Sequence, residues 1–284
     1  MSTAWPIELR PVSSIACAAF VDAAPGKARV TVLVRAAFAF APGEAVTRVE
    51  PEPFRPDELR PSGGSEEIVL DRFRPRVEVT LVGQRHALVG EPGPLPPARL
   101  VLTRGANVVL DRTLGTAGNA STVVATSQRI DFLGGDEELL LEGFHPRLRA
   151  LRAQLPGARA LGCVRRARGQ VDPLPFVAEA LHIDAERARC ALIWRAQIDV
   201  ADEAELRALI VDLGVESAGA PVALPALSEA VRELARPAIT ELTLVIDEAA
   251  GAAPAPLPGA APAPPTKAAL PPSPSPPIPA KPSP

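Results

Sequence analysis

The chain has 284 residues, with 30 Lys or Arg and 33 Asp or Glu, which gives a formal net charge of −3. The two signs are interspersed, so the sequence lacks the basic stripe that binding to a nucleic-acid backbone requires. It also shows no signal-peptide pattern at the N-terminus and no apolar run of about 18 residues, so we expect no membrane span and a cytoplasmic location.

Composition changes near residue 248. Residues 249–284 are mostly Pro, Ala, Ser and Gly, and Lys267 and Lys281 are the only charged residues among them. Such a segment cannot bury enough apolar surface to offset the entropy of ordering, so we predict a disordered tail that serves as a tether, a docking peptide or an inert end. Residues 1–248 are predicted to form a β-rich domain, with two subdomains, 1–120 and 121–248, as an alternative.

The cysteines indicate a reducing compartment. Cys17, Cys163 and Cys190 form an odd set without CxxC spacing, so a disulfide framework is not expected. Cys17 and Cys190 lie in apolar runs and are predicted to act as small buried hydrophobic residues.

Short apolar or alternating runs separated by turn residues predict a series of hairpins. Residues 24–27 (APGK), 104–107 (RGAN), the Gly134-Gly135 pair and 184–187 (DAER) are the predicted turns. The strands that they join are predicted at 12–21 with 28–40, 99–102 with 108–114, 123–132 with 138–144, and 177–183 with 189–200. Val77, Val79 and Leu81 predict a further half-buried strand that Gly83 interrupts, and 145–155 fits either a helix or a strand, with a strand favoured by its neighbours.

Helices are predicted only near the C-terminal end of the folded part. Asp202 precedes Glu205 by three residues, as in a capping box, and Leu206, Leu209, Ile210 and Leu213 follow at helical spacing up to Gly214. A second helix over 227–235 and a last strand over 239–247 are also expected. The predicted fold class is therefore mainly β, with antiparallel, hairpin-built sandwich or barrel-like sheets and one or two short helices.

Three segments of the sequence together form a recognisable pattern. The first comprises Asp71–Pro75 with Glu78-Val79, Gly83 and His86-Ala87. The second runs from Gln128 through 134–137 and Leu141 to His145-Pro146 and 155–157. The third is 181–184 with Ile193-Trp194-Arg195. These segments resemble a known bacterial family, domain of unknown function 2169. Glu78 replaces the usual Asp of the family, Arg85 replaces a small residue before the His, and 115–126 replaces a long middle region, so the chain resembles a shortened member.

The resemblance implies an adaptor or chaperone beside a type VI secretion system, with a secreted effector or spike protein as its partner and without enzymatic activity. Two other readings are a structural component of the secreted assembly and a hydrolase with dispersed catalytic residues. A β-sandwich that binds carbohydrate is a further alternative, although aromatic residues make up only 4% of the chain.

Six residues are candidates for partner binding. His86 follows Gly83 at a predicted strand end, next to Arg85, where the backbone often meets a partner. Trp194 and Arg195 fit either the core or an interface, because Trp and Arg are frequent binding hot spots. Arg165 and Arg166 belong to a basic cluster that is either a solvated turn or a contact for an acidic partner.

No catalytic, metal or cofactor pattern stands out in the sequence. His86, His145 and His182 lack metal-ligand spacing, and no cofactor or metal ion is predicted. The 62–65 loop (SGGS) has neither a nucleophile-elbow nor a Walker pattern. The acidic 134–138 run lacks the alternating ligands of a calcium loop and is predicted to be a turn.

Overall fold

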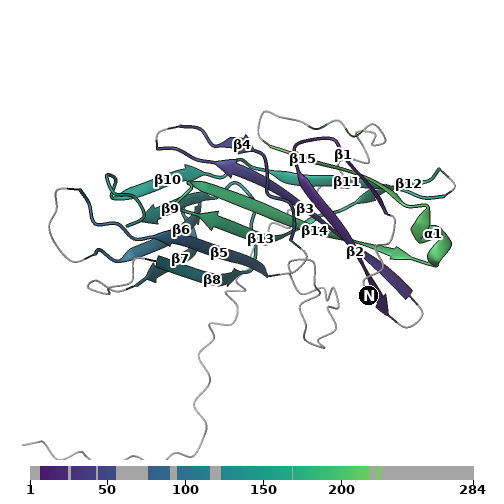
Figure 1. Ribbon diagram of the computed structural model, residues 1–284, viewed down its shortest axis with the longest axis horizontal. Coiled ribbons are helices and arrows are strands. Elements are labelled where there is room, and N and C mark those ends of the chain that lie inside the picture. The colour runs from purple at the N-terminus through teal and green to yellow at the C-terminus, as the bar shows by residue number, and fades with distance from the viewer. Residues whose placement is uncertain are drawn as a thin grey trace, which may run out of the picture. The chain divides into compact units, whose positions relative to one another are not determined.

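The computed structural model describes residues 7–24, 27–42, 44–55, 76–89, 95–115, 123–167, 169–217, 222 and 224. Within these ranges the chain forms fifteen strands and one short helix (Figure 1). The chain divides into two units, Met1–Ile239 and Thr240–Pro284, and every described residue belongs to the first unit. The protein is therefore mainly β, as the sequence predicts.

The largest sheet has seven strands and contains two of the predicted hairpins. The hairpins over 12–40 and 177–200 are confirmed as the pairs β2–β3 and β13–β14. β13 also pairs in parallel with β5, so the sheet is mixed rather than purely antiparallel. Its order is β2 (Ala16–Ala24), β3 (Lys27–Ala39), β14 (Arg189–Val200), β13 (Val177–Asp184), β5 (Val77–Gln84) and β8 (Val123–Ile130), and β4 (Thr47–Val49) pairs with β3.

The period-2 pattern of β5 places Val77, Val79 and Leu81 on the inner face of this sheet, whereas Val82 is exposed. Val77, Val79 and Leu81 are buried, and the side chains between them are exposed or half-buried. The strand runs on through Gly83 to Gln84, so Gly83 does not interrupt it as the sequence suggests.

A four-stranded antiparallel sheet contains the third confirmed hairpin. Its order is β10 (Ala150–Gln154), β9 (Glu138–Glu142), β6 (Ala98–Arg104) and β7 (Asn107–Leu114). β6 and β7 form the predicted hairpin, in which Gly105 adopts a φ of +55° that favours glycine. β10 confirms the preference for a strand within 145–155.

A second four-stranded sheet was not predicted as a unit. Its order is β1 (Glu8–Pro11), β15 (Ile210–Glu216), β11 (Arg159–Arg165) and β12 (Val171–Leu174), and β1 runs parallel to β15. Its two central strands are buried on both faces, and Leu161 and Cys163 pack on the outer side against Val222 and Leu224.

One apolar core joins the buried faces of all three sheets. It includes Val34 and Leu192 from the seven-stranded sheet, Leu100 from β6, and Val211 from β15. Strands from both sides of residue 120 pair within the seven-stranded sheet, since β14 pairs with β3 and β13 with β5. The described strands therefore share a single core across that position.

The predicted hairpin over 123–144 is wrong. β8 pairs with β5 in the seven-stranded sheet, whereas β9 pairs with β6 and β10 in the four-stranded sheet. The Gly134-Gly135 pair binds a carboxylate between the two sheets: their N–H groups donate to Glu137 at 2.7 and 2.9 Å, and Arg104 donates to it as well. Glu137 is fully buried, so this run is a sheet-to-sheet crossover.

The predicted helix over 203–213 is correct at its start and wrong beyond residue 207. Asp202 caps α1 (Glu203–Arg207) by accepting the Glu205 N–H at 2.8 Å, and Glu205 accepts the Ala201 N–H at 2.7 Å. The apolar residues that follow belong to β15 instead. Because β15 is an inner strand that buries residues on both faces, its apolar residues do not alternate, and their spacing resembles that of a helix.

The three cysteines are free thiols. Burial raises the pKa of Cys190 to about 12 and is also the main cause that raises the pKa of Cys163 to about 11, with Asp212 as a further cause. Cys17 is half-buried, and burial raises its pKa too. Cys190 and Cys17 pack as hydrophobic residues, as predicted, and these pKa values disfavour the reactive thiolate form.

Several predictions concern residues outside the described ranges. They include the helix over 227–235, the strand over 239–247, the tail over 249–284, the 62–65 loop and Asp71–Pro75. Within the described part of the chain, no helix has the length and apolar character needed to cross a membrane.

Candidate functional site

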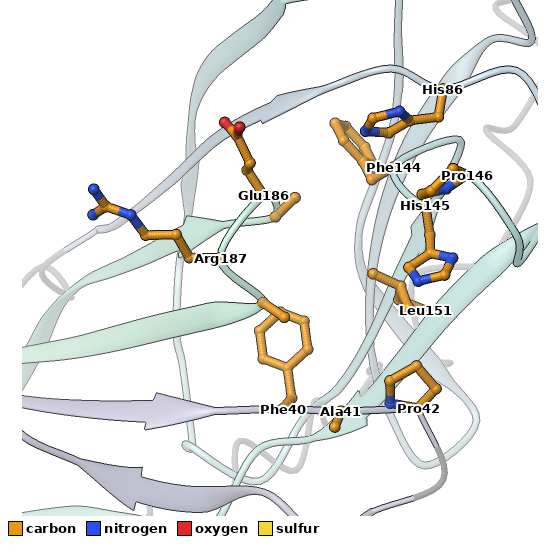
Figure 2. A pocket seen from close by; sticks show the side chains of 12 residues that line it. Phe40, Ala41, Pro42, His86, Phe144, His145, Pro146, Leu151, Glu186 and Arg187 are labelled. Atoms are coloured by element: carbon orange, nitrogen blue, oxygen red, sulfur yellow. The ribbon is translucent and has the colours of Figure 1, made fainter.

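Four segments that are distant in sequence meet at one hollow, with a volume of about 370 Å³ (Figure 2). They are the end of β3, the segment after β5, the loop between β9 and β10, and the turn between β13 and β14. The hollow is lined by Phe40, Ala41, Pro42, His86, Phe144, His145, Pro146, Leu151, Ala185, Glu186, Arg187 and Ala188. We call it the loop hollow.

Backbone hydrogen bonds fix these segments to one another. Phe40 donates its N–H to the Ala188 carbonyl at 2.9 Å, which joins the end of β3 to the β13–β14 turn. His86 donates to the Gly143 carbonyl at 2.9 Å, and Ala185 donates to Val82 at 2.9 Å. The strand ends that form the rim are therefore hydrogen-bonded to one another. The loop hollow is a preformed feature of the fold.

Gly83 allows Phe144 and the β13–β14 turn to approach β5 closely beneath the rim of the loop hollow. A Cβ atom at Gly83 would lie 2.8 Å from the Ala185 Cβ and 3.0 Å from Cδ1 of Phe144. Only a residue without a side chain lets the Phe144 ring and the β13–β14 turn pack together on β5. Phe144 is 3% exposed and Phe40 is 5% exposed, so the two rings form the floor rather than the open wall.

The β13–β14 turn carries a strained backbone at the rim. Asp184 accepts the Arg187 N–H at 3.0 Å, and Ala188 then adopts a φ of +49°. Within the described residues it is the one non-glycine residue with positive φ. Such conformations cost free energy and are frequent where binding surfaces are formed.

His145 organises the loop after β9. Its Nδ1 accepts the N–H groups of Arg147 at 3.1 Å and Leu148 at 3.0 Å. In this arrangement the neutral ring carries its proton on Nε2. His145 is therefore a local turn-forming residue.

The two charged side chains of the lining differ in their surroundings. Arg187 lies 3.3 Å from a carboxylate oxygen of Glu52 and 3.7 Å from one of Asp184. Glu186 is exposed and makes no ion pair with any residue in the described ranges. Figure 2 shows Glu186 and Arg187 on one side of the loop hollow and His86 with Phe144 on the other.

The side chains of the adjacent residues His86 and Arg85 lie in different environments. The half-buried side chain of His86 lines the loop hollow. Arg85 points inward, is 2% exposed, and donates to the carbonyls of Pro96 at 2.7 Å and Leu95 at 3.2 Å. The prediction of Arg85 as a surface contact is wrong, because its guanidinium fastens the segment before β6.

Trp194 and Arg195 lie away from the loop hollow, on opposite faces of β14. Trp194 is 5% exposed and belongs to the common core, which is the core alternative of its two sequence readings. Arg195 is half-buried and lies 3.3 Å from a Glu179 carboxylate oxygen. Burial raises the pKa of Glu179, and the charge of Arg195 partly opposes that shift.

Arg165 and Arg166 are engaged within the protein. Arg165 lies 2.6 Å from the buried carboxylate of Asp212. Arg166 binds Asp172 at 2.8 Å and also pairs with Glu205, and the Arg166 hydrogen bond lowers the pKa of Asp172. The sequence left these arginines as either a solvated turn or a contact for an acidic partner, whereas the structure engages both charges in internal pairs that tie β11 to β15, β12 and α1.

Sequence spacing did not reveal the loop hollow. His86 and His145 are far apart in the chain but line the same hollow, because His86 donates its N–H to Gly143, close to His145. Phe40, Glu186 and Arg187 carried no functional signal in the sequence, since each sits at an ordinary strand end or turn. Within the described residues, no cluster of three or more His, Cys, Asp or Glu side chains is arranged to hold a metal ion.

The family comparison agrees with the resemblance noted in the sequence. The family described as an uncharacterized protein conserved in bacteria (DUF2169) matches residues 116–195. The chain therefore resembles this family over the stretch from β8 into β14. That stretch supplies two of the four segments around the loop hollow, those of 144–151 and 185–188. Comparisons with curated proteins and with solved structures gave no match.

Proposed function

We propose that this protein is a non-enzymatic adaptor that binds a secreted effector or a spike component of a type VI secretion system in the cytoplasm and assists its loading. The observation that carries the proposal is the loop hollow, a preformed depression at strand ends with room for a side chain of a partner. Binding residues often lie on loops that a rigid scaffold positions, and here the scaffold is the β3–β14–β13–β5 sheet.

The composition of the loop hollow suits a protein partner. Its floor is apolar, with Phe40 and Phe144, and its rim is polar, with His86 and Glu186. An apolar centre with a polar rim is the usual anatomy of a protein interface. A single inserted side chain would be surrounded by groups from four segments, which is how interface hot spots are commonly accommodated.

The secretion context comes from the family resemblance. The matched stretch, residues 116–195, contributes half of the segments around the loop hollow. We therefore assign partner binding to the loop hollow and expect the partner among effector and spike proteins encoded beside this protein's gene.

Co-purification tests this function. The tagged full chain is co-expressed with each candidate effector and spike protein from the same gene cluster. Ala41→Trp places a large side chain in the loop hollow, and Ala167→Trp places the same side chain in the exposed turn between β11 and β12. We expect one candidate to co-purify with wild type and Ala167→Trp and to be lost with Ala41→Trp. Equal recovery with both variants would contradict binding at the hollow.

A further inference from the structure

The charge of the loop hollow points to the chemistry of its occupant. The lining contains one carboxylate, Glu186, and one guanidinium, Arg187. Arg187 is already flanked by two carboxylates, of Glu52 and Asp184, whereas Glu186 makes no ion pair within the described residues. The charge that the hollow offers to a partner is therefore negative.

The remaining accessible lining is flat and weakly polar. Pro42 and Pro146 are exposed, and the His86 and His145 rings are half-buried, so rings rather than flexible chains form the wall. Nδ1 of His145 already accepts two backbone N–H groups, which fixes that ring in its loop. A side chain entering here meets ring faces along its length and a carboxylate at one side.

We infer that the loop hollow is a receptor for an arginine side chain of the partner, an inference that rests on the proposed function. The aliphatic stem packs on Pro42 and Pro146, and the planar guanidinium stacks on an imidazole ring and donates to the Glu186 carboxylate. Arginine fits better than lysine, because its planar head is weakly hydrated, stacks on rings and donates two parallel hydrogen bonds to one carboxylate. An acidic side chain is disfavoured, because it would approach Glu186 with like charge.

NMR titration of the full chain with small probes tests the inference. The probes are N-acetyl-arginine amide and N-acetyl-citrulline amide, which have nearly the same shape but differ in charge. We expect the arginine probe to shift the backbone amide signals of residues 86, 145 and 186 at millimolar concentration, and the citrulline probe to bind about tenfold more weakly. Equal binding of the two probes would overturn the inference.

Two glutamine variants provide the matched comparison. Glu186→Gln keeps the side-chain length and removes the charge, so the arginine probe should bind about tenfold more weakly. Glu203→Gln makes the same change on α1, where Glu203 pairs with Arg207, and should leave binding unchanged. An unchanged affinity for Glu186→Gln would show that the carboxylate does not receive the guanidinium.

The co-purification experiment separates this inference from the proposed function. If Ala41→Trp loses the partner and Glu186→Gln keeps it fully, the hollow binds the partner but not through an arginine, and the inference fails alone. If Ala41→Trp keeps the partner, the proposed function fails at this site, whatever the titration shows. Loss of the partner with both variants supports the two together.

Discussion

Replacing Glu137 tests how the crossover between two sheets is held together. Its carboxylate is fully buried and accepts N–H groups from Gly134 and Gly135 and a guanidinium hydrogen bond from Arg104. In Glu137→Ala both backbone N–H groups lose their acceptor, and each such buried group costs about 1–3 kcal/mol. We expect the free energy of unfolding to fall by about 2–5 kcal/mol, mostly from these two unpaired N–H groups, because the Arg104 guanidinium is 37% exposed and stays hydrated.

Glu137→Gln keeps the volume and separates the charge from the packing. One amide oxygen still accepts, but the amide NH₂ now faces a donor, so the expected loss is about 1.5–3 kcal/mol. Asp136→Asn is the control, because Asp136 is 63% exposed and lies 3.6 Å from Arg104. Such an exposed pair contributes about 0–1 kcal/mol.

Urea unfolding at pH 7, followed by circular dichroism, measures all three variants. The reasoning predicts the order of loss Glu137→Ala, then Glu137→Gln, then Asp136→Asn. A Glu137→Gln protein as stable as wild type would refute it, because the buried charge would then not be the group that organises the crossover.

Three further predictions concern the strands around the loop hollow, and the same unfolding assay measures them. Gly83→Ala should lower stability by about 1–3 kcal/mol, because the new Cβ would lie 2.8 Å from the Ala185 Cβ and 3.0 Å from the Phe144 ring. An unchanged stability would contradict the close packing. Ala188→Gly should raise stability by about 0.5 kcal/mol, because glycine removes the strain of the positive φ and this gain exceeds its entropy cost on folding. Ala185→Gly is the control and should lower stability, because Ala185 has no positive φ. In wild type, the raised pKa of Glu179 makes its charged form unfavourable in the folded protein, so the free energy of unfolding falls as pH rises above the ordinary Glu pKa. Glu179→Gln removes this loss, so the variant should become more stable relative to wild type over that pH range. A pH-independent difference between the two proteins would contradict this.

Local patterns identified the strands and hairpins whose partners lie next to them in sequence. The alternation of Val77, Val79 and Leu81 indicated both the strand and its buried face. The turn residues at 104–107 and 184–187 were sufficient for two hairpins, because a short turn leaves few other arrangements. The strand ends were less certain, as the continuation of β5 through Gly83 shows.

The errors arose where distant contacts decide the structure. Gly134-Gly135 has the composition of a hairpin turn, but the burial of Glu137 against Arg104 directs the chain into another sheet. The leucines after Asp202 have helical spacing, but pairing with β11 converts them into an inner strand. Neither Arg104 nor β11 is near these segments in sequence, so a local pattern could not indicate the outcome.

The candidate site shows the same limit more strongly. Its residues come from four strand ends, and their proximity follows from the parallel pairing of β5 with β13 and from the hydrogen bond between His86 and Gly143. The sequence identified His86 because it follows a glycine at a strand end. It could not identify Glu186, whose proposed role depends on Arg187 being engaged by carboxylates from two other positions.

The stretch that resembles the family cannot form the loop hollow by itself. Within 116–195, β13 needs β5 as a neighbour, β9 needs β6, and β14 needs β3. Phe40 and His86, which complete the floor and the rim, come from outside the matched stretch. A partner that binds the loop hollow would therefore contact a surface that several strands form together, rather than one contiguous sequence motif. Substitutions in β3 or β5 should affect binding as much as substitutions within 116–195.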